Sequence, residues 1–229
     1  MTLILDKYQY PKLTRAEVNG NRRYQTPEGS KVPSVTTILS ATKPEKDKAG
    51  LQKWRDRVGE KTAKAVTTEA ANRGTRMHKY LEDLCLTGEC PKPGSNPYSI
   101  QAHKMANVII DKAMCDVDEV WGVEVALYVP KIYAGTTDLV GQYKGNPAIM
   151  DHKQSNKFKK EEYVQDYYLQ MAAYGTAHND VYGTNIREGH VFMCTIDLVY
   201  QQFSITPDKW DYWANEWWKR VEQFYVENS

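Results

Sequence analysis

Two aspartates and a lysine, Asp138, Asp151 and Lys153, are residue types that together can cleave a phosphate ester. Asp151 and Lys153 are two positions apart in a strand-like run, so both side chains leave the same face of the strand. Asp138 lies in the preceding strand-like segment, and turn residues at 144–147 would fold the two strands into a hairpin. Carboxylates hold a hard divalent cation, and an ammonium group beside them can orient a water next to a phosphate. The pattern therefore predicts phosphodiester hydrolysis.

Two further residues could join this site. Glu124 lies in another strand-like run, and His78 borders an apolar helical stripe, so its ring is expected to face inward. A carboxylate at Asp138, between apolar neighbours, needs an ion or a strong partner to offset its burial. The structural alternative is a salt bridge from Lys153 to either aspartate and a histidine satisfied within the core. The residues alone leave both interpretations open.

The elements that must position these groups follow from hydrophobic periodicity and turn residues. Asn19-Gly20 predicts an N-terminal hairpin turn, and Ser34 is expected to cap the first helix. Helices are expected at 35–40, 51–58, 62–86, 100–114 and 161–178, and a last one begins at Thr206-Pro207-Asp208. Strands are expected at 119–129, 132–143, 147–153, 189–196 and 199–205. This order predicts an α/β fold with a mixed central sheet.

Three local features refine this outline. Gly74 lies inside the long helix and predicts a kink or break there. Segments 42–48 and 87–97 are expected to be loops. The last helix carries aromatic residues at spacings of three and four, which is typical of a face that packs against a sheet. These stripe residues are Trp210, Trp213, Trp217, Val221 and Phe224.

The net charge of +1 conceals a gradient along the chain. Residues 1–80 hold 17 Lys and Arg against 8 Asp and Glu, a net charge of +9. The net charge is −1 over residues 81–160 and −7 over residues 161–229. A basic third on a neutral protein is typical of a chain that contacts a polyanion on one side, although solvated helix faces would also account for it.

Composition limits the class of protein. At 229 residues the chain can bury a substantial core within one domain, and no apolar run approaches the roughly 20 residues of a membrane-spanning helix. The start of the chain has no signal-peptide pattern, so we expect a soluble cytoplasmic protein. The four cysteines form no CxxC pair, which argues against a structural zinc site.

Four short motifs occur in order along the chain. They are GxxxH (Gly74 to His78), GxxD (Gly135 to Asp138), DxK (Asp151 to Lys153) and QxxxY (Gln170 to Tyr174). Together they resemble the RecB-like branch of the PD-(D/E)xK nuclease superfamily. The segments 26–29 and 32–39 are similar to those of the mitochondrial genome maintenance exonuclease group and its phage relatives. The resemblance covers about residues 24 to 176.

The resemblance implies a restriction-endonuclease-like core and a set of roles. Mg²⁺ or Mn²⁺ would be held by His78, Asp138, Asp151 and the backbone carbonyl of His152, with Glu124 as a further candidate. Lys153 would orient the attacking water and act with the two aspartates in catalysis. Substrate would contact Ser34, Thr36, Thr37, Arg76, Gln170 and Tyr174. Thr137 replaces the proline that gives the superfamily its name. Some RecB-like nucleases bind an iron–sulfur cluster through clustered cysteines; only Cys194 follows Cys115 here, so no cluster is expected.

The expected function is a metal-dependent DNA exonuclease that prefers single-stranded ends, in DNA replication, recombination or repair or in phage DNA metabolism. For a phage protein the location would be the host cytoplasm, and a monomer is favoured. The chain is expected to form one nuclease domain, 1–229, with a basic hairpin and helical part at 1–97 and a mixed-sheet catalytic core at 98–229. Two alternatives remain: a structure-specific endonuclease of the same superfamily, and a nucleic-acid-binding protein without catalysis.

Overall fold

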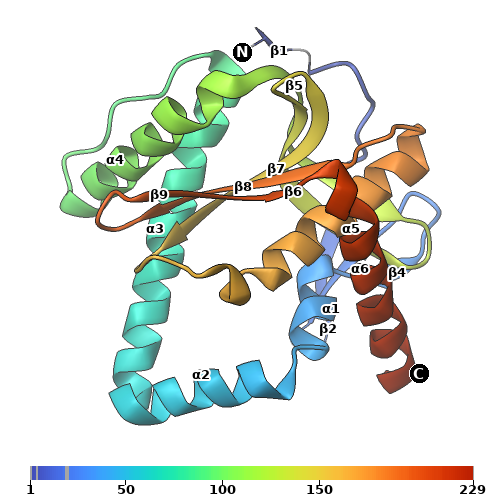
Figure 1. Ribbon diagram of the computed structural model, residues 1–229, viewed down its shortest axis with the longest axis horizontal. Helices are drawn as coiled ribbons and strands as arrows, with labels where there is room; N and C mark the ends of the chain where they lie inside the picture. Colours follow the sequence, from blue (N-terminus) through green and yellow to red (C-terminus); the bar gives the residue numbers. More distant parts are fainter. Residues whose placement is uncertain (1, 4, 19–20, 229) are drawn as a thin grey trace.

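A six-stranded mixed sheet forms the centre of the computed structural model, which describes residues 2–3, 5–18 and 21–228 (Figure 1). Its strands, in spatial order, are β1 (Thr2–Leu3), β5 (Val117–Val129), β6 (Tyr133–Tyr143), β7 (Asn146–Ser155), β8 (Glu188–Thr195) and β9 (Tyr200–Ile205). The pairs β1–β5 and β7–β8 are parallel, and the other neighbours are antiparallel. The predicted α/β fold with a mixed sheet is confirmed.

Helices cover both faces of this sheet, as Figure 1 shows. One face packs against α3 (Glu60–Thr87) and α4 (Pro97–Lys112), and the other against α1 (Val35–Ala41), α5 (Gln165–Tyr182) and α6 (Pro207–Glu227). In β7, Ile149 enters one apolar core, whereas Ala148 and Met150 enter the other. This alternation follows from the two-residue period of a strand, and it makes β7 a strand with both faces buried.

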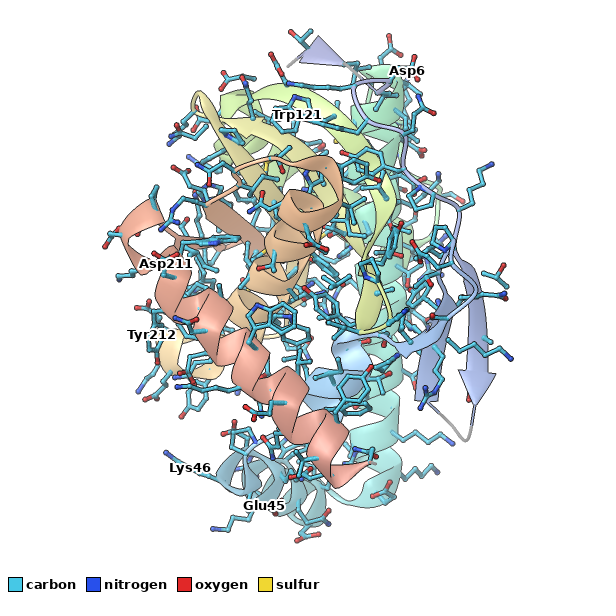
Figure 2. The ribbon with its side chains drawn as sticks, turned by 90° about the vertical axis from the view of Figure 1, so that its right-hand side faces the viewer. Asp6, Glu45, Lys46, Trp121, Asp211 and Tyr212 are labelled. Carbon is cyan, nitrogen blue, oxygen red and sulfur yellow. The ribbon has the colours of Figure 1, made fainter. Side chains whose placement is uncertain are left out.

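A second, smaller sheet lies beside the main one and consists of β2 (Thr14–Val18), β3 (Asn21–Gln25) and β4 (Lys31–Pro33). Figure 2 shows the N-terminal segment that carries Asp6 running along the outside of the molecule to this sheet. Tyr24 and Val32 pack on Tyr128 and Ala134, which anchors the small sheet to β5 and β6. The predicted Asn19-Gly20 turn lies outside the described residues.

Several predicted details are confirmed. Lys144 and Gly145 both have positive φ, 50° and 84°, as the type I′ turn of a two-residue hairpin requires. Ser34 caps α1, since its Oγ accepts the Thr37 N–H at 3.0 Å. The aromatic stripe of α6 is buried at Trp210 and Trp217.

Two predictions about helices are wrong: a break at Gly74, and a loop over the whole of 42–48. A kink at Gly74 stays a prediction. The helix α3 passes through Gly74 without a break, because buried side chains on both sides of the glycine, among them Ala63 and Met77, hold one continuous face against its neighbours. The segment 42–48 is only partly a loop, since α2 (Glu45–Val58) begins within it. Pro44 precedes the helix and acidic residues occupy its first turn, which is a favourable start. The described part of α2 buries no residue, and the helix lies at one end of α3, away from the sheet (Figure 1).

Short 3₁₀ turns complete the described elements, at Met114–Asp116 and Glu161–Tyr163. Among the described residues, no helix is both long enough and apolar enough to cross a membrane.

The packing of α5 on α6 generates a stability prediction. A Cβ on Gly175 would overlap the Trp210 ring, so Gly175→Ala forces this junction apart. We expect a loss of about 1–3 kcal/mol in the free energy of unfolding, measured by chemical denaturation. Gly50→Ala in α2 is the matched control: its Cβ would meet no atom within 4 Å, and alanine favours a helix by up to ~1 kcal/mol. Equal stability of the two variants would contradict the packing account.

Candidate metal centre and active site

The site forms where β6 and β7 separate. Their ladder ends at the pair Leu139–Met150, and β7 continues beyond it paired with β8 as far as Ser155. One residue past the end of the ladder, the Asp138 carboxylate accepts the backbone N–H of His152 at 2.7 Å. A side chain thus takes the place of a missing ladder bond, and the gap between the strands leaves room for polar groups.

Three potential ligands converge at this gap. In the β5–β6 pairing, Val123 faces Leu139 and Val125 faces Thr137, which places Glu124 opposite Asp138. Glu124 leaves the regular ladder with a φ of 50°. From α3, the His78 Nδ1 lies 3.3 Å from an Asp138 carboxylate oxygen. One ligand atom from each of His78, Glu124 and Asp138 lies within 4.8 Å of the other two.

This donor set suits a hard divalent cation. Two carboxylate oxygens and an imidazole nitrogen are ligands that Mn²⁺ accepts, and Mg²⁺ is bound through one or two carboxylates with waters completing its shell. Like charges directly opposite each other on paired strands destabilise a sheet, so Glu124 and Asp138 need a compensating positive charge. The residues present therefore fit a divalent metal ion.

The pKa values of these groups reflect the closeness of the two carboxylates and of the positive charges around them. Burial alone would raise the pKa of Asp138, but His78 and Lys153 outweigh it and hold that pKa below its usual range. Although much of the Glu124 side chain is exposed, partial desolvation of its carboxylate and the charge of Asp138 raise the pKa of Glu124 to about 7. Burial lowers the pKa of His78, but the adjacent Asp138 carboxylate raises that pKa by a larger amount. The net shift is therefore upward.

Asp151 and Lys153 are in contact through the carboxylate and the ammonium group. Their side chains share one face of β7, as the sequence predicts, and Asp151 is buried. Burial and the charge of Asp138 raise the pKa of Asp151 despite its lysine partner. Lys153 also lies 5.5 Å from the centre of the Tyr167 ring. The ion pair considered from the sequence is therefore present, and Asp151 lies outside the three-residue set of His78, Glu124 and Asp138.

His152 has its side chain on the opposite face of β7. Its Nδ1 lies 3.6 Å from the Asp138 carboxylate, and its ring centre is 6.1 Å from that of His78. Burial lowers the pKa of His152 to about 4, so the ring is neutral. The ligand role expected for its backbone carbonyl stays a prediction.

Two hollows meet at this centre. The wide cleft has a volume of about 760 Å³, and the inner pocket has a volume of about 270 Å³. His78, Glu124 and Arg15 line both, so the candidate metal centre lies between them. The wide cleft is also lined by Ala70, Ala71, Gly74, Thr75, Lys79, Glu82, Lys153 and Gln154. The inner pocket is also lined by Arg22, Tyr24, Ser34, Val35, Thr36, Gly135, Thr136, Asp138, Gln170 and Tyr174.

The GxxD and QxxxY motifs meet in the inner pocket. A Cβ on Gly135 would lie 2.7 Å from the Tyr174 ring, so glycine at this position lets the ring approach β6 closely. The Gln170 amide donates to the Tyr174 hydroxyl at 3.3 Å. The glycine of one motif thus makes space for the tyrosine of the other, three residues from Asp138.

Other expected substrate contacts divide into two groups. Ser34 and Thr36 line the inner pocket, whereas the Thr37 hydroxyl donates to the Arg22 carbonyl at 3.0 Å and supports the turn into α1. Arg76 is exposed, lines neither hollow and bonds the Asn72 carbonyl of its own helix at 3.4 Å. Two residues before His78 on a helix, its side chain leaves roughly the opposite side. The structure therefore does not bring Arg76 to this centre.

Sequence reasoning missed several residues at the site. Arg15, Arg22 and Tyr24 reach it from the small sheet, and the Tyr24 hydroxyl lies 3.4 Å from Thr136 Oγ1. Only the positive charge of the N-terminal third pointed toward them. Arg73 is buried and donates to Gln154 at 3.0 Å, which ties α3 to β7 next to Lys153.

Comparison with known proteins finds sequence similarity to proteins named as exonucleases. No protein-family model matches it. It is 28% identical over 209 residues to mitochondrial genome maintenance exonuclease 1 of Xenopus tropicalis and 27% identical over 205 residues to that of Mus musculus. Each alignment covers 84% of this chain, but only 57% of the Xenopus tropicalis protein and 59% of the Mus musculus protein. The chain therefore spans less than two thirds of the length of these relatives. The resemblance to this exonuclease group is confirmed.

A solved structure from Eubacterium rectale, provisionally named an exonuclease, aligns with a TM-score of 0.47 at 16% identity. The alignment covers 66% of this chain and 64% of the other.

The raised pKa of Glu124 generates a prediction for metal binding. Below about pH 7 this carboxylate holds a proton that a cation must displace, so Mn²⁺ affinity should increase as the pH rises and binding should release protons. Calorimetric titration in two buffers of different ionisation enthalpy counts those protons. Glu124→Gln should bind Mn²⁺ about tenfold more weakly and release fewer protons. The protons that this variant still releases should come from His78.

Glu82→Gln is the matched control, because Glu82 lines the wide cleft without belonging to the three-residue set. Its affinity should stay close to that of the wild-type protein, and its proton release should fall only slightly, because the Glu82 charge makes a minor contribution to the raised pKa of Glu124. Unchanged Mn²⁺ binding by Glu124→Gln would exclude Glu124 as a ligand.

Proposed function

We propose that this protein is a metal-dependent DNA exonuclease that uses Mg²⁺ or Mn²⁺ and prefers single-stranded ends. The observation that carries the proposal is the pair of opposed carboxylates, Glu124 and Asp138. Together with His78 they form a three-residue set between the two hollows. The Asp151–Lys153 ion pair lies next to this set. Two opposed carboxylates at the meeting point of two hollows suit a cation that binds a phosphate. The curated relatives named above carry exonuclease names, which supports the same reaction class.

The proposed roles follow from the positions of the residues. His78, Asp138 and Glu124 would hold the metal ion, with Asp151 and the His152 carbonyl as further ligands. The bound ion supplies Lewis-acid stabilisation of charge on the scissile phosphate. Lys153 orients the attacking water and stabilises the negative charge that develops on the phosphate oxygens. Asp151 holds the Lys153 ammonium in place, and the buried His152 ring lies neutral beside Asp138.

A third hollow, the aromatic hollow of about 650 Å³, supports the preference for single strands. It shares Ala70 and Gln154 with the wide cleft, so the two lie next to each other. Its remaining lining consists of Trp54, Arg57, Val58, Val66, Ser155, Asn156, Lys157, Phe158, Lys159, Tyr163 and Tyr167. Among the described residues this lining includes no carboxylate. Rings that stack on unpaired bases, together with cations that contact the backbone, are typical of single-strand binding.

Lys153→Ala tests the catalytic proposal. Without the ammonium group, cleavage of an end-labelled single-stranded oligonucleotide in Mg²⁺ should fall by about a hundredfold to a thousandfold, while binding in EDTA changes by less than about threefold. Product gels over time and fluorescence anisotropy provide the two measurements. Because Lys153→Ala leaves Asp151 without a partner, Lys153→Gln and a thermal unfolding curve should accompany it.

Lys144→Ala is the control, since Lys144 lies in the β6–β7 turn and pairs with Asp116 at 3.0 Å. This variant should cleave like the wild-type protein. A circular oligonucleotide of the same sequence should resist cleavage. Full activity of Lys153→Ala would overturn the mechanism, and efficient cutting of the circle would establish an endonuclease instead.

Phe158→Ala tests the role of the aromatic hollow. Phe158 is 68% exposed, so its loss should not disturb the core, but it removes a stacking surface. The Kd for a single-stranded oligonucleotide should rise about tenfold, with a smaller change for a duplex of the same length. Tyr212→Ala on α6, where Tyr212 is 60% exposed, is the matched control and should leave both Kd values unchanged (Figure 2). Equal losses for single strand and duplex would argue against stacking.

A further inference from the structure

The inner pocket has two chemically opposite walls. His78, Glu124 and Asp138 form the wall that it shares with the candidate metal centre. Arg15 and Arg22 from the small sheet also line it. Polar groups complete the lining: the hydroxyls of Tyr24, Ser34, Thr36, Thr136 and Tyr174 and the amide of Gln170. The pocket thus combines an acidic side, which a metal ion would neutralise, with two guanidinium groups.

The strand pairing of the small sheet explains how both arginines reach the pocket. Arg15 faces Tyr24 across the β2–β3 pair, and Arg22 is two residues before Tyr24, so the three side chains share one face. Arg23 leaves the opposite face and donates to the Lys31 carbonyl at 3.4 Å. Val32 faces Tyr24 from β4, and the anchoring of both on the main sheet keeps the arginine face toward Asp138.

Both guanidinium groups lack an anionic partner in the part of the chain that the structure describes. No carboxylate oxygen lies within 4.0 Å of Arg15 or Arg22, although Glu17 faces Arg22 in the strand pairing. An arginine that lines a pocket and has no protein anion is available for a ligand anion. The planar fork of guanidinium donors matches phosphate oxygens, and neighbouring hydroxyls can complete the contact.

The sizes of the two hollows indicate which part of a strand each can take. The wide cleft has nearly three times the volume of the inner pocket, about 760 Å³ against about 270 Å³. Pockets for drug-sized molecules start at about 300 Å³, so the inner pocket has room for a single small group rather than a continuing chain. A phosphomonoester at a strand end fits this space. Its charge of about −1.5 to −2 is larger than that of an internal diester, so two arginines attract it more strongly.

We propose that the inner pocket binds the terminal phosphate of a DNA strand, with Arg15 and Arg22 as its direct ligands and Thr36 and Tyr24 as hydroxyl partners. The proposal rests on the exonuclease function proposed above and specifies how the strand end is recognised. The phosphate at the end occupies the arginine side, and the scissile phosphate lies at the His78, Glu124 and Asp138 side. The shared chemistry is a phosphomonoester, at either the 5′ or the 3′ end.

Binding without metal tests this proposal separately from catalysis. Three fluorescent single-stranded oligonucleotides of one sequence, with a 5′-phosphate, a 3′-phosphate or no terminal phosphate, are titrated with protein in EDTA. The wild-type protein should bind one of the phosphorylated forms about tenfold more tightly than the unphosphorylated form. Arg22→Gln should remove this difference and leave the Kd of the unphosphorylated form within about twofold. The form that binds more tightly identifies the end that the pocket recognises.

Arg23→Gln is the matched control, because it removes the same charge from the other face of the same strand. It should keep the full preference for a terminal phosphate. Equal affinity of the wild-type protein for all three oligonucleotides would overturn the proposal, and so would equal losses with Arg22→Gln and Arg23→Gln. Failure of the wild-type protein to cleave any linear strand in Mg²⁺ would instead contradict the exonuclease function, whatever the binding preference.

Discussion

The opposition of Glu124 and Asp138 across β5 and β6 is the constraint around which the centre of this molecule is arranged. A sheet does not normally place two carboxylates against each other without compensation. Here the compensation is distributed: His78 approaches from α3, Lys153 approaches from β7, and the His152 N–H donates to Asp138. The opening of the β6–β7 ladder follows from the same arrangement, since the Asp138 carboxylate occupies the position of a ladder bond.

Much of the fold could be predicted because it depends on local patterns. The β6–β7 hairpin follows from Lys144-Gly145, and the buried face of α6 follows from the spacing of its tryptophans. The predicted break at Gly74 failed because local propensity competes with packing: a cost of about 1 kcal/mol for a helical glycine is small beside the burial of Met77 and Leu81.

The candidate site could be predicted only in part. Asp138, Asp151, Lys153 and His78 have recognisable types and spacings, and the structure places them together. The irregular φ of Glu124 and the approach of Arg22 cannot be derived from spacing, because each depends on how distant segments pack. The spatial contact between the motif residues Gly135 and Tyr174 is likewise visible only in three dimensions.

The helix α2 has a consequence for how such a protein can diverge. It contributes no buried residue, and yet Trp54 and Arg57 line the aromatic hollow. Selection on the core therefore places little restriction on this helix, and its surface can drift in charge and ring content while the fold remains intact. Adaptation to new substrates could thus accumulate in α2 at low cost in stability, whereas β6 and β7, buried on both faces, would change slowly.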